Sequence, residues 1–314
     1  MNLELRDIGA RYEDAATVIR RAFHTNNETF LNYNSKFLAS CYAYPGVQSE
    51  LSPAFFHDDR VVSVLVSLPR HVIFESQRLA LALLTLNAVE PEYRAYGLGI
   101  EMVAEAVRRA RTSGYDGAIY YCVDGHPANR TSAAGVKAAN EACSHVYTVE
   151  YLIKILRAPS SHESELAGAN DFLYGAERLK QRTSFCRVWT ADEADWQCCA
   201  RYGGLSERLE KQGNRGVVTG YILEAESGTG CLFVEDLLWD DLDMDGRKML
   251  LQRLLNRAAR SAQIAVVPIW GYTQYDIFRE MGFRRSNRRL HVYLSLWNGL
   301  EITSPPDAMY IDAL

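Results

Sequence analysis

The hydrophobic and polar positions of the first half of the chain predict an alternation of strands and helices. Residues 3–8 alternate apolar and charged side chains, as a half-buried strand does. Residues 14–24 carry their apolar side chains at helical spacing. The same patterns predict strands at 54–56, 60–68 and 79–89, a helix over 100–113 closed by Gly114, a strand at 117–123, a helix-leaning stretch at 127–143 and a strand at 145–156.

The second half repeats this order of elements. Residues 158–183 have weak periodicity and are rich in Pro, Ser, Glu, Gly and Asn, which predicts a linker in which 172–179 fits a short helix. The repeat indicates an α/β fold of the mixed α+β type with two domains, 1–157 and 184–314, although residue identities do not recur. The elements predicted after the linker are a strand at 186–189, a helix at 191–208, strands at 217–224 and 231–239, a helix at 247–263, a strand at 264–270, a helix at 274–281 and a strand at 288–297.

One loop stands between the apolar strand ending at Val89 and the helix that follows. Pro91 stops the strand, and the loop then carries Arg94, Gly97 and Gly99. The two glycines permit positive φ and remove side chains that would keep a phosphate away from the backbone. Their amides and the unpaired N–H groups of the helix start form an anion cradle, to which Arg94 adds a charge-assisted hydrogen bond.

Other phosphate-binding patterns fit this loop less well. The glycine spacing differs from the dinucleotide fingerprint. A P-loop is excluded because no Gly-Lys-Ser/Thr follows. A glycine-rich turn without any ligand is the remaining alternative.

Composition narrows the class of protein. The chain has 314 residues, 48% hydrophobic, with a net charge of -5, so we expect no nucleic-acid partner. The charged N-terminus lacks a signal-peptide core and no apolar run is long enough to span a membrane, which predicts a cytoplasmic protein without membrane association. The seven cysteines and seven histidines are scattered, which argues against a disulfide framework and a metal site. The oligomeric state is left open.

Residues 89–99, Val-Glu-Pro-Glu-Tyr-Arg-Ala-Tyr-Gly-Leu-Gly, resemble the acetyl-CoA motif of the GNAT superfamily of N-acetyltransferases. The order of elements over residues 1–156 is similar to that family as well. The resemblance implies that acetyl-CoA, or another acyl-CoA, is the co-substrate. The residues that it assigns to CoA are Arg94, Ala95, Tyr96, Gly97, Leu98 and Gly99 for the pyrophosphate, the backbone of Asn87, Ala88 and Val89 for the pantetheine arm and thioester carbonyl, and Asn129 for the cofactor arm.

The catalytic positions of the family are not matched. Residues 83–89 contain no acid, and Val136 stands where the resemblance would put a tyrosine. Asp124 and His126, just past the strand at 117–123, are the candidates for general base or proton relay. His126 has a plain alternative, since a loop histidine beside Pro127 commonly has no catalytic role. Tyr147 is a further candidate acid, although a strand tyrosine is more often a core residue.

The loop before the long helix of the second half is acidic. It reads Asp-Asp-Leu-Asp-Met-Asp-Gly over residues 240–246, and four aspartates would repel a pyrophosphate. Residues 278–283 nevertheless resemble the helix ending and Gly-Phe turn of a GNAT domain. We expect a degenerate second domain that does not bind CoA and helps to wall the acceptor site, with the aspartates forming a solvated loop rather than a metal cluster.

These observations predict an acetyl-CoA-dependent N-acetyltransferase. The acyl group would pass by direct attack in a ternary complex to the primary amine of a small-molecule or peptide acceptor. The aromatic segment 30–44 either shapes the acceptor pocket or packs on the sheet. Two alternatives stay open: a catalytically silent CoA-binding tandem protein acting as sensor or scaffold, and other acyl-CoA chemistry.

Overall fold

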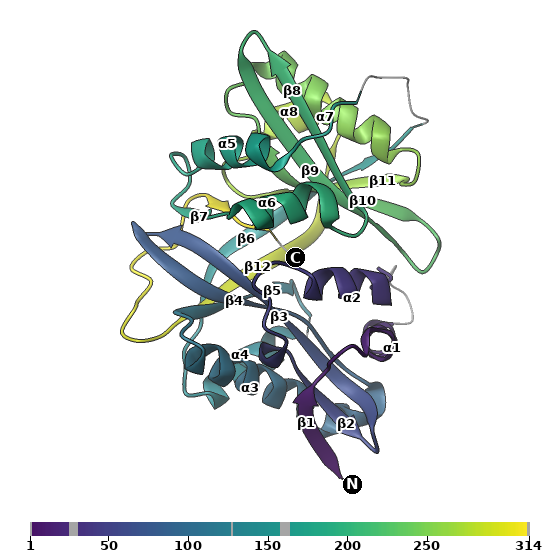
Figure 1. The fold of residues 1–314 in the computed structure, drawn as a ribbon, viewed down its shortest axis with the longest axis vertical. Coiled ribbons are helices and arrows are strands. Elements are labelled where there is room, and N and C mark those ends of the chain that lie inside the picture. The colour runs from purple at the N-terminus through teal and green to yellow at the C-terminus, as the bar shows by residue number, and fades with distance from the viewer. Residues whose placement is uncertain (1, 25–30, 127, 158–163, 313–314) are drawn as a thin grey trace.

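A computed structural model describes residues 2–24, 31–126, 128–157 and 164–312. We call residues 2–155 the first half and residues 169–312 the second half. In Figure 1 the two halves form two lobes, with the first half below and the second above. The elements of the first half are β1 (Leu3–Asp7), α1 (Tyr12–Phe23), α2 (Ser35–Tyr42), η1 (Ser49–Leu51), β2 (Pro53–His57), β3 (Arg60–Phe74), β4 (Gln77–Val89), η2 (Pro91–Tyr96), α3 (Leu98–Thr112), β5 (Gly117–Val123), α4 (Ala128–Ala138) and β6 (Ser144–Ile155).

The second half repeats the plan in its central elements. Its β10–α7–β11 corresponds to β4–α3–β5, and α3 and α7 each have 15 residues. The elements of this half are α5 (Ala169–Leu179), β7 (Phe185–Arg187), α6 (Ala191–Asp195), η3 (Trp196–Ala200), β8 (Gly204–Lys211), β9 (Asn214–Glu224), β10 (Gly230–Leu238), α7 (Met244–Ala258), β11 (Ile264–Ile269), α8 (Tyr275–Glu280), β12 (Arg284–Leu296) and β13 (Met309–Tyr310).

The strands of both halves form one continuous mixed sheet, in the order β1-β2-β3-β4-β5-β12-β6-β11-β10-β9-β8. β12 of the second half pairs with β5, and β6 of the first half pairs with β11, so the halves exchange their last long strands. The short strands β7 and β13 pair with each other, and β7 also pairs with the far end of β3. The predicted α/β class and mixed sheet are confirmed. The boundaries 1–157 and 184–314 stay a prediction, because the sheet runs across them.

Helices cover both faces of the sheet. α1 and α2 share one core with the inner elements of the second half, while α3 and α4 cover the opposite face of the first half in a second core. The two helices of that second face pack closely, since a Cβ on Gly135 of α4 would lie 2.5 Å from Cβ of Val103 on α3. This close packing holds the C-terminal half of α4 against the first two turns of α3.

One predicted helix is wrong. Residues 191–208 were expected to be helical, but the helical segment ends at Ala200 and β8 begins at Gly204. β8 pairs antiparallel with β9 through a tight turn in which Gln212 and Gly213 both have positive φ. Hairpin pairing outweighs the helix propensity of the Leu, Glu and Arg residues in this stretch.

The predicted linker is partly an ordered helix. Within its described part, α5 packs on β9 and β10 with Phe172 fully buried. Residues 158–163 of the linker lie outside the described residues, as do Phe30 of the aromatic segment and Pro127. Sequence reasoning also missed β13, a strand too short to show a period.

Candidate functional site

The glycine loop before α3 leaves the start of the helix open. Gly97 is the N-cap residue with φ of 72°, and no side chain caps the helix. The first hydrogen bonds inside the helix are donated by Ile100 and Glu101 to the carbonyl of Gly97, so the N–H groups of Leu98 and Gly99 precede them. A Cβ on Gly97 would meet nothing within 4 Å, which means that the loop faces open space. Backbone amides at an uncapped helix start are suited to binding an anion.

β4 changes course before it reaches this loop. Its parallel pairing with β5 ends at Leu84, opposite Tyr120, so β4 from Thr85 onward has no ladder partner on that side. Leu86 has φ of 51°, and the register with β3 shifts there, which identifies a β-bulge. Backbone N–H and C=O groups of the last residues of β4 are therefore available to a ligand lying between β4 and β5.

Asn87 connects this bulge to the glycine loop. Its Nδ2 donates to the carbonyl of Gly99 at 3.1 Å. Its Oδ1 is buried and has no hydrogen-bond partner. Because a buried acceptor without a partner is costly, Asn87 Oδ1 is suited to receive a hydrogen bond from a ligand amide.

The other residues predicted to bind CoA surround the same loop. Ala95 and the 58% exposed Tyr96 lie in η2, and Ala88 and Val89 follow the bulge. Arg94 donates to the carbonyl of Ala22 at the end of α1, at 2.6 Å, and so ties the loop to α1. Asn129 lies in the first turn of α4 and donates to Tyr293 Oη of β12 at 2.7 Å.

The two candidate proton carriers have different surroundings. His126 Nδ1 accepts from the backbone N–H of Ala128 and thus caps the start of α4. Asp124 lies one residue past β5, with Oδ1 3.3 Å from Nε2 of His291 on β12. Nδ1 of His291 lies 3.0 Å from Thr148 Oγ1 and 3.3 Å from His145 Nε2. Sequence reasoning missed this histidine pair, because β12 reaches β5 only through the strand exchange.

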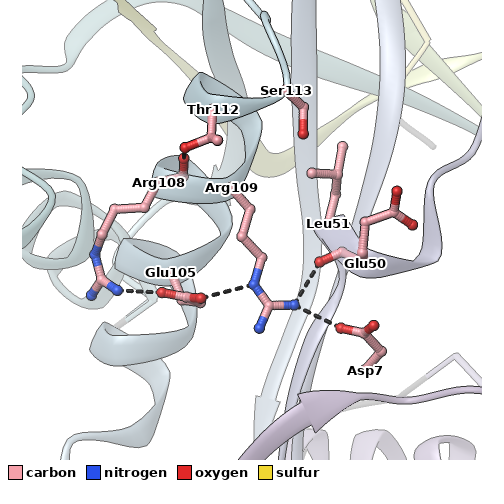
Figure 2. Close-up of a pocket in the computed structure, with 8 residues that line it drawn as sticks. All are labelled: Asp7, Glu50, Leu51, Glu105, Arg108, Arg109, Thr112 and Ser113. Atoms are coloured by element: carbon pink, nitrogen blue, oxygen red, sulfur yellow. Dashed lines mark hydrogen bonds and ion pairs between the residues drawn. The ribbon is translucent and has the colours of Figure 1, made fainter.

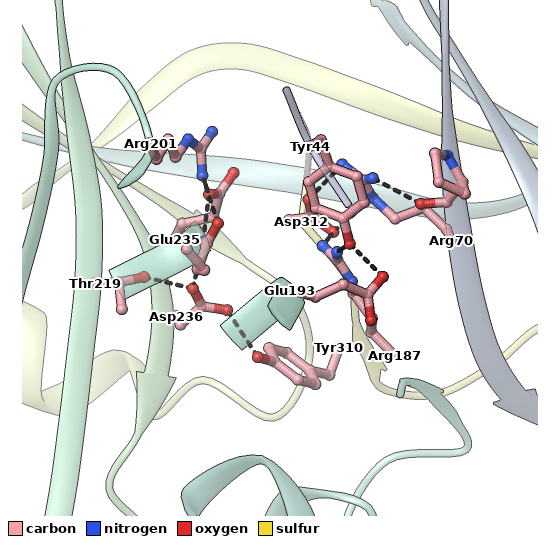
Figure 3. A network of polar contacts seen from close by, with 12 residues as sticks. Tyr44, Arg70, Arg187, Glu193, Arg201, Thr219, Glu235, Asp236, Tyr310 and Asp312 are labelled. Atoms are coloured by element: carbon pink, nitrogen blue, oxygen red, sulfur yellow. Dashed lines mark hydrogen bonds and ion pairs between the residues drawn. The ribbon is translucent and has the colours of Figure 1, made fainter. Parts of the chain in front are cut away.

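A buried polar network lies between the two halves, on the face of β5 that carries Tyr121 (Figure 3). Asp312 accepts from Arg70 of β3 at 3.0 and 2.7 Å and forms an ion pair with Arg187 of β7. Burial opposes ionisation of Asp312, yet the guanidinium groups of Arg187 and Arg70 outweigh it and lower the pKa of this carboxyl. The backbone carbonyl of Asp312 accepts from Tyr121 Oη at 2.9 Å, so the chain segment after β13 is fixed against β5. Figure 3 also shows Tyr44 between Arg187 and Glu193.

The second half carries carboxylates at the equivalent bulge. Glu235 and Asp236 lie where the register of β10 with β9 shifts. Burial raises the pKa of both carboxyls, which Arg201 opposes at Glu235 and a hydrogen bond from Thr219 opposes at Asp236. Asp236 also accepts from Tyr310 Oη at 2.7 Å. These acids are held by the protein's own side chains.

The acidic loop before α7 is closed as well. Asp243 caps α7 by accepting from the N–H of Gly246 at 2.7 Å. Asp240 and Asp241 pair with Arg182 and Arg178 and are each 17% exposed, so the expectation of a solvated loop is wrong for these two. Arginine pairing outweighs hydration here because α5 packs beside the loop.

Two open grooves lie near α3, at opposite ends. The groove in Figure 2 has a volume of about 470 Å³ and lies at the C-terminal end of α3. There Arg109 donates hydrogen bonds to Glu105 and Asp7, and Arg108 donates to Glu105. Its charged groups serve to hold β1 and α3 together, and it lies about 20 Å along the helix from the glycine loop. A second groove, of about 400 Å³, lies beside that loop and is lined by Arg20, Arg21, His24, Pro91, Glu92 and Glu226.

Both halves form that second groove. His24 Nδ1 at the end of α1 lies 3.0 Å from Glu226 Oε2, in the turn between β9 and β10. The N–H of Asn32 donates to the carbonyl of Glu224 at 2.7 Å. The first and second halves are thus joined on both sides of residues 25–30.

In the ranges that the structure describes, no group of three or more His, Cys, Asp or Glu side chains is placed to bind a metal ion. The described helices are all too short or too polar to cross a membrane. All seven cysteines are free thiols.

Comparisons with known proteins agree with this geometry. The family model described as "Acetyltransferase (GNAT) domain" matches residues 9–128. No curated protein sequence matches the chain. The N-myristoyltransferase of Saccharomyces cerevisiae, solved with bound myristoyl-CoA, superposes with a TM-score of 0.74 at 13% identity, over 96% of this chain and 84% of that one.

Two further solved structures are similar at lower scores. A GCN5-related N-acetyltransferase from Kribbella flavida has a TM-score of 0.53 at 15% identity, over 94% of this chain and 70% of that one. A probable N-acyltransferase from Enterococcus faecalis has a TM-score of 0.53 at 11% identity, over 94% and 72%. At these identities the likeness shows the fold. Residues 9–128, which include the glycine loop, match the GNAT domain model, and the chain as a whole has a two-lobed fold like that of these structures.

Proposed function

We propose that this GNAT protein is an acetyl-CoA-dependent N-acyltransferase that acts on a primary amine of a small molecule or peptide. Acyl transfer is the chemistry of the family and of the similar structures. The observation that carries the proposal is the continuous arrangement of an uncapped helix start, the unpaired Oδ1 of Asn87 and the free edge of β4. These three features match a diphosphate, an amide-bearing arm and a thioester carbonyl in that order.

In the proposed complex the N–H groups of Leu98 and Gly99 bind the diphosphate of CoA. Asn87 Oδ1 accepts from an amide of the pantetheine arm, which lies between β4 and β5. Backbone N–H groups of the β4 bulge donate to the thioester oxygen, an interaction that contributes about 3 kcal/mol in other acyl-transfer sites. Holding both substrates together supplies about 7–11 kcal/mol at best.

The proposed reaction needs one proton to leave the acceptor. A neutral amine nitrogen attacks the thioester carbon, the C–N bond forms, and the C–S bond then breaks to release the CoA thiolate. We assign the proton path to Asp124 and His291, since the carboxylate orients the imidazole through Nε2 and leaves Nδ1 facing Thr148 and His145. The proton passes from the amine to this pair and returns to the thiolate. His126 is the weaker candidate, because its Nδ1 already caps α4.

An acetyl group suits the surroundings of β4 better than a long acyl chain. Leu86 and Ala88 are buried against the core shared with α1. Tyr121, on the neighbouring strand, packs against Trp270 and binds the carbonyl of Asp312. A fourteen-carbon chain entering from this side would have to displace packed side chains and a buried ion pair.

The second half acts as a wall in this proposal and does not bind CoA. Its glycine loop is replaced by the closed aspartate loop, and Glu226 lines the groove beside the first half's loop. The exchange of β6 and β12 holds it in a fixed position. The acceptor would then lie between the halves.

Calorimetric titration followed by a free-thiol assay tests the proposal. We expect acetyl-CoA to bind one site per chain and to release thiol only when an amine is added, and myristoyl-CoA to bind more weakly. Binding of acetyl-CoA without thiol release over a panel of amines would favour the alternative, a CoA-binding sensor or scaffold. The absence of an acid from β4 is the observation that keeps this alternative in view.

A further inference from the structure

The strand β12 carries a dense group of arginines at its start. Arg284, Arg285, Arg288 and Arg289 lie within six residues that contain no acid, which gives a formal charge of +4 in a chain whose net charge is -5. All four are exposed, with 63% of the Arg285 and 56% of the Arg289 side chain accessible. We call residues 284–289 the arginine segment.

The arginine segment has few neutralising partners. Glu150 of β6 lies 3.7 Å from Arg285 and 3.5 Å from Arg289 and is shared by both. Arg285 also stacks over the ring of Tyr275 at 4.8 Å. Neither Arg284 nor Arg288 has an acid partner in the described part of the chain. One carboxylate therefore faces four guanidinium groups, and their mutual repulsion opposes folding.

The segment is also a distortion of the strand. Arg285 is opposite Leu152 of β6 and Arg289 is opposite Glu150, so residues 286–288 have only one partner residue between them and bulge out of the ladder. This bulge lies where β12 passes from pairing with β6 alone to pairing with both β5 and β6. Bulges that interrupt a ladder are frequent beside functional sites, where they direct side chains.

The bulge adjoins the open end of β5. The N–H of Asp124 donates to the carbonyl of Arg289 at 3.0 Å, and Leu290 pairs with Val123. β12 is thus two strands away from β4, about 10 Å at ordinary strand spacing. An extended peptide covers this distance in about three residues.

We infer that the arginine segment is the docking surface for an acidic stretch of a peptide acceptor, beginning at about the fourth residue from the amine that receives the acyl group. This inference rests on the proposed function. The segment lies opposite Ile153 to Glu150 of β6, about 10 Å along the ladder, and four guanidinium groups over this length match several carboxylates on an extended chain rather than one small anion. Guanidinium groups bind carboxylates in a bidentate manner, which favours Asp and Glu side chains. A nucleic acid fits less well, because Glu150 and Asp124 flank the segment.

A binding experiment tests the surface without requiring catalysis. The full chain, saturated with CoA, is titrated against fluorescent peptides of eight residues whose positions 4–8 are all Glu, all Gln or all Lys, with anisotropy as the readout. We expect the Glu peptide to bind at least tenfold more tightly than the Gln peptide, and less tightly as salt is raised. In Arg288→Glu/Arg289→Glu the preference should pass to the Lys peptide.

The control has the same change in net charge elsewhere. Arg78→Glu/Arg260→Glu alters two exposed arginines, at the start of β4 and after α7, and should bind the Glu peptide as the unmodified chain does. Equal affinity for the Glu and Gln peptides would overturn the inference, as would equal losses in the two double variants. Tighter binding of an oligonucleotide of equal charge would overturn the choice of a peptide.

The thiol assay separates this inference from the proposed function. Selective binding of the Glu peptide without thiol release from any amine would retain the docking surface and reject the transferase. Thiol release with a small amine but no selective peptide binding would retain the transferase and reject the surface. Loss of release with the Glu peptide in Arg288→Glu/Arg289→Glu, with release to a small amine unchanged, would support both.

Discussion

Gly97 and Asp243 are the N-cap residues of equivalent 15-residue helices, but only Asp243 caps its helix with a side-chain hydrogen bond. Gly97 contributes no side chain and leaves the first amides of α3 accessible. Asp243 places its carboxylate on the N–H of Gly246 and so occupies the start of α7 itself. This contrast supports the proposal that the anion site lies in the first half, because a negative side chain already takes the place of a phosphate in the second.

Replacing Gly97 by Glu should abolish CoA binding while the fold is kept. The new side chain would have room, since nothing lies within 4 Å of a Cβ there, but its charge would repel the diphosphate. The positive φ should cost about 1 kcal/mol of stability. Calorimetry with acetyl-CoA measures the binding, and thermal unfolding measures the fold. Gly97→Ala is the matched control, with the same backbone cost but no added charge, and it should retain most of the affinity.

Asp243→Ala should leave the affinity for acetyl-CoA unchanged. Loss of the cap and of the Lys211 contact at 3.0 Å should lower the free energy of unfolding. Urea unfolding and calorimetry give the two quantities on one preparation. A tenfold weaker affinity would show that the second half takes part in binding CoA, against the assignment made here.

Asp312→Asn should destabilise the protein strongly at neutral pH. The substitution leaves Arg70 and Arg187 buried without a carboxylate, a situation that costs about 3–5 kcal/mol in other proteins. Since the pKa of Asp312 is lowered in the folded state, its ionised form contributes stability above the ordinary pKa of about 3.9 and loses it as pH falls through the folded value. The difference between variant and unmodified chain should therefore shrink below about pH 3.9.

Urea unfolding at pH 7 and at pH 3 measures this difference. Asp307→Asn changes an exposed aspartate in the same segment and should alter stability by less than about 0.5 kcal/mol at either pH. A difference for Asp312→Asn that is the same at both pH values would mean that the ion pairs do not account for the effect.

His291→Gln and Asp124→Asn should each lower kcat for thiol release by about 10²-fold or more and leave the dissociation constant for acetyl-CoA unchanged. Both side chains belong to the proposed proton path, whereas neither contacts the glycine loop. The double variant should lose little more than either single one, because the two groups act together. His126→Gln should reduce kcat less than His291→Gln does. A larger loss of kcat in His126→Gln would identify His126, on the loop after β5, as the general base.

The glycine loop could be predicted from sequence because its residues are consecutive. Pro91, Gly97 and Gly99 mark the end of a strand and the start of a helix through their own backbone preferences, and the structure has both elements there. Most other elements were also predicted to within a few residues. The helix predicted over 191–208 failed because pairing of β8 with β9, a tertiary interaction, overrode local propensity.

The proton path and the polar network could not be predicted in this way. Asp124 and His291 are 167 residues apart, and Arg70 and Asp312 are 242 apart. No periodicity or motif relates such positions. Their meeting depends on the exchange of β6 and β12 between the halves, and a short C-terminal strand then fixes the last described residues at the centre of the molecule.

The sequence by itself determined the secondary-structure order, the mixed α/β class and the loop that is suited to bind an anion, because each follows from residues that are neighbours in the chain. Only the tertiary structure decided that the two halves share one sheet, that Asp124 faces His291 and that an arginine bulge lies beside the end of β5. These relationships join distant segments, and they arise from strand pairing and burial, to which local sequence preferences contribute little.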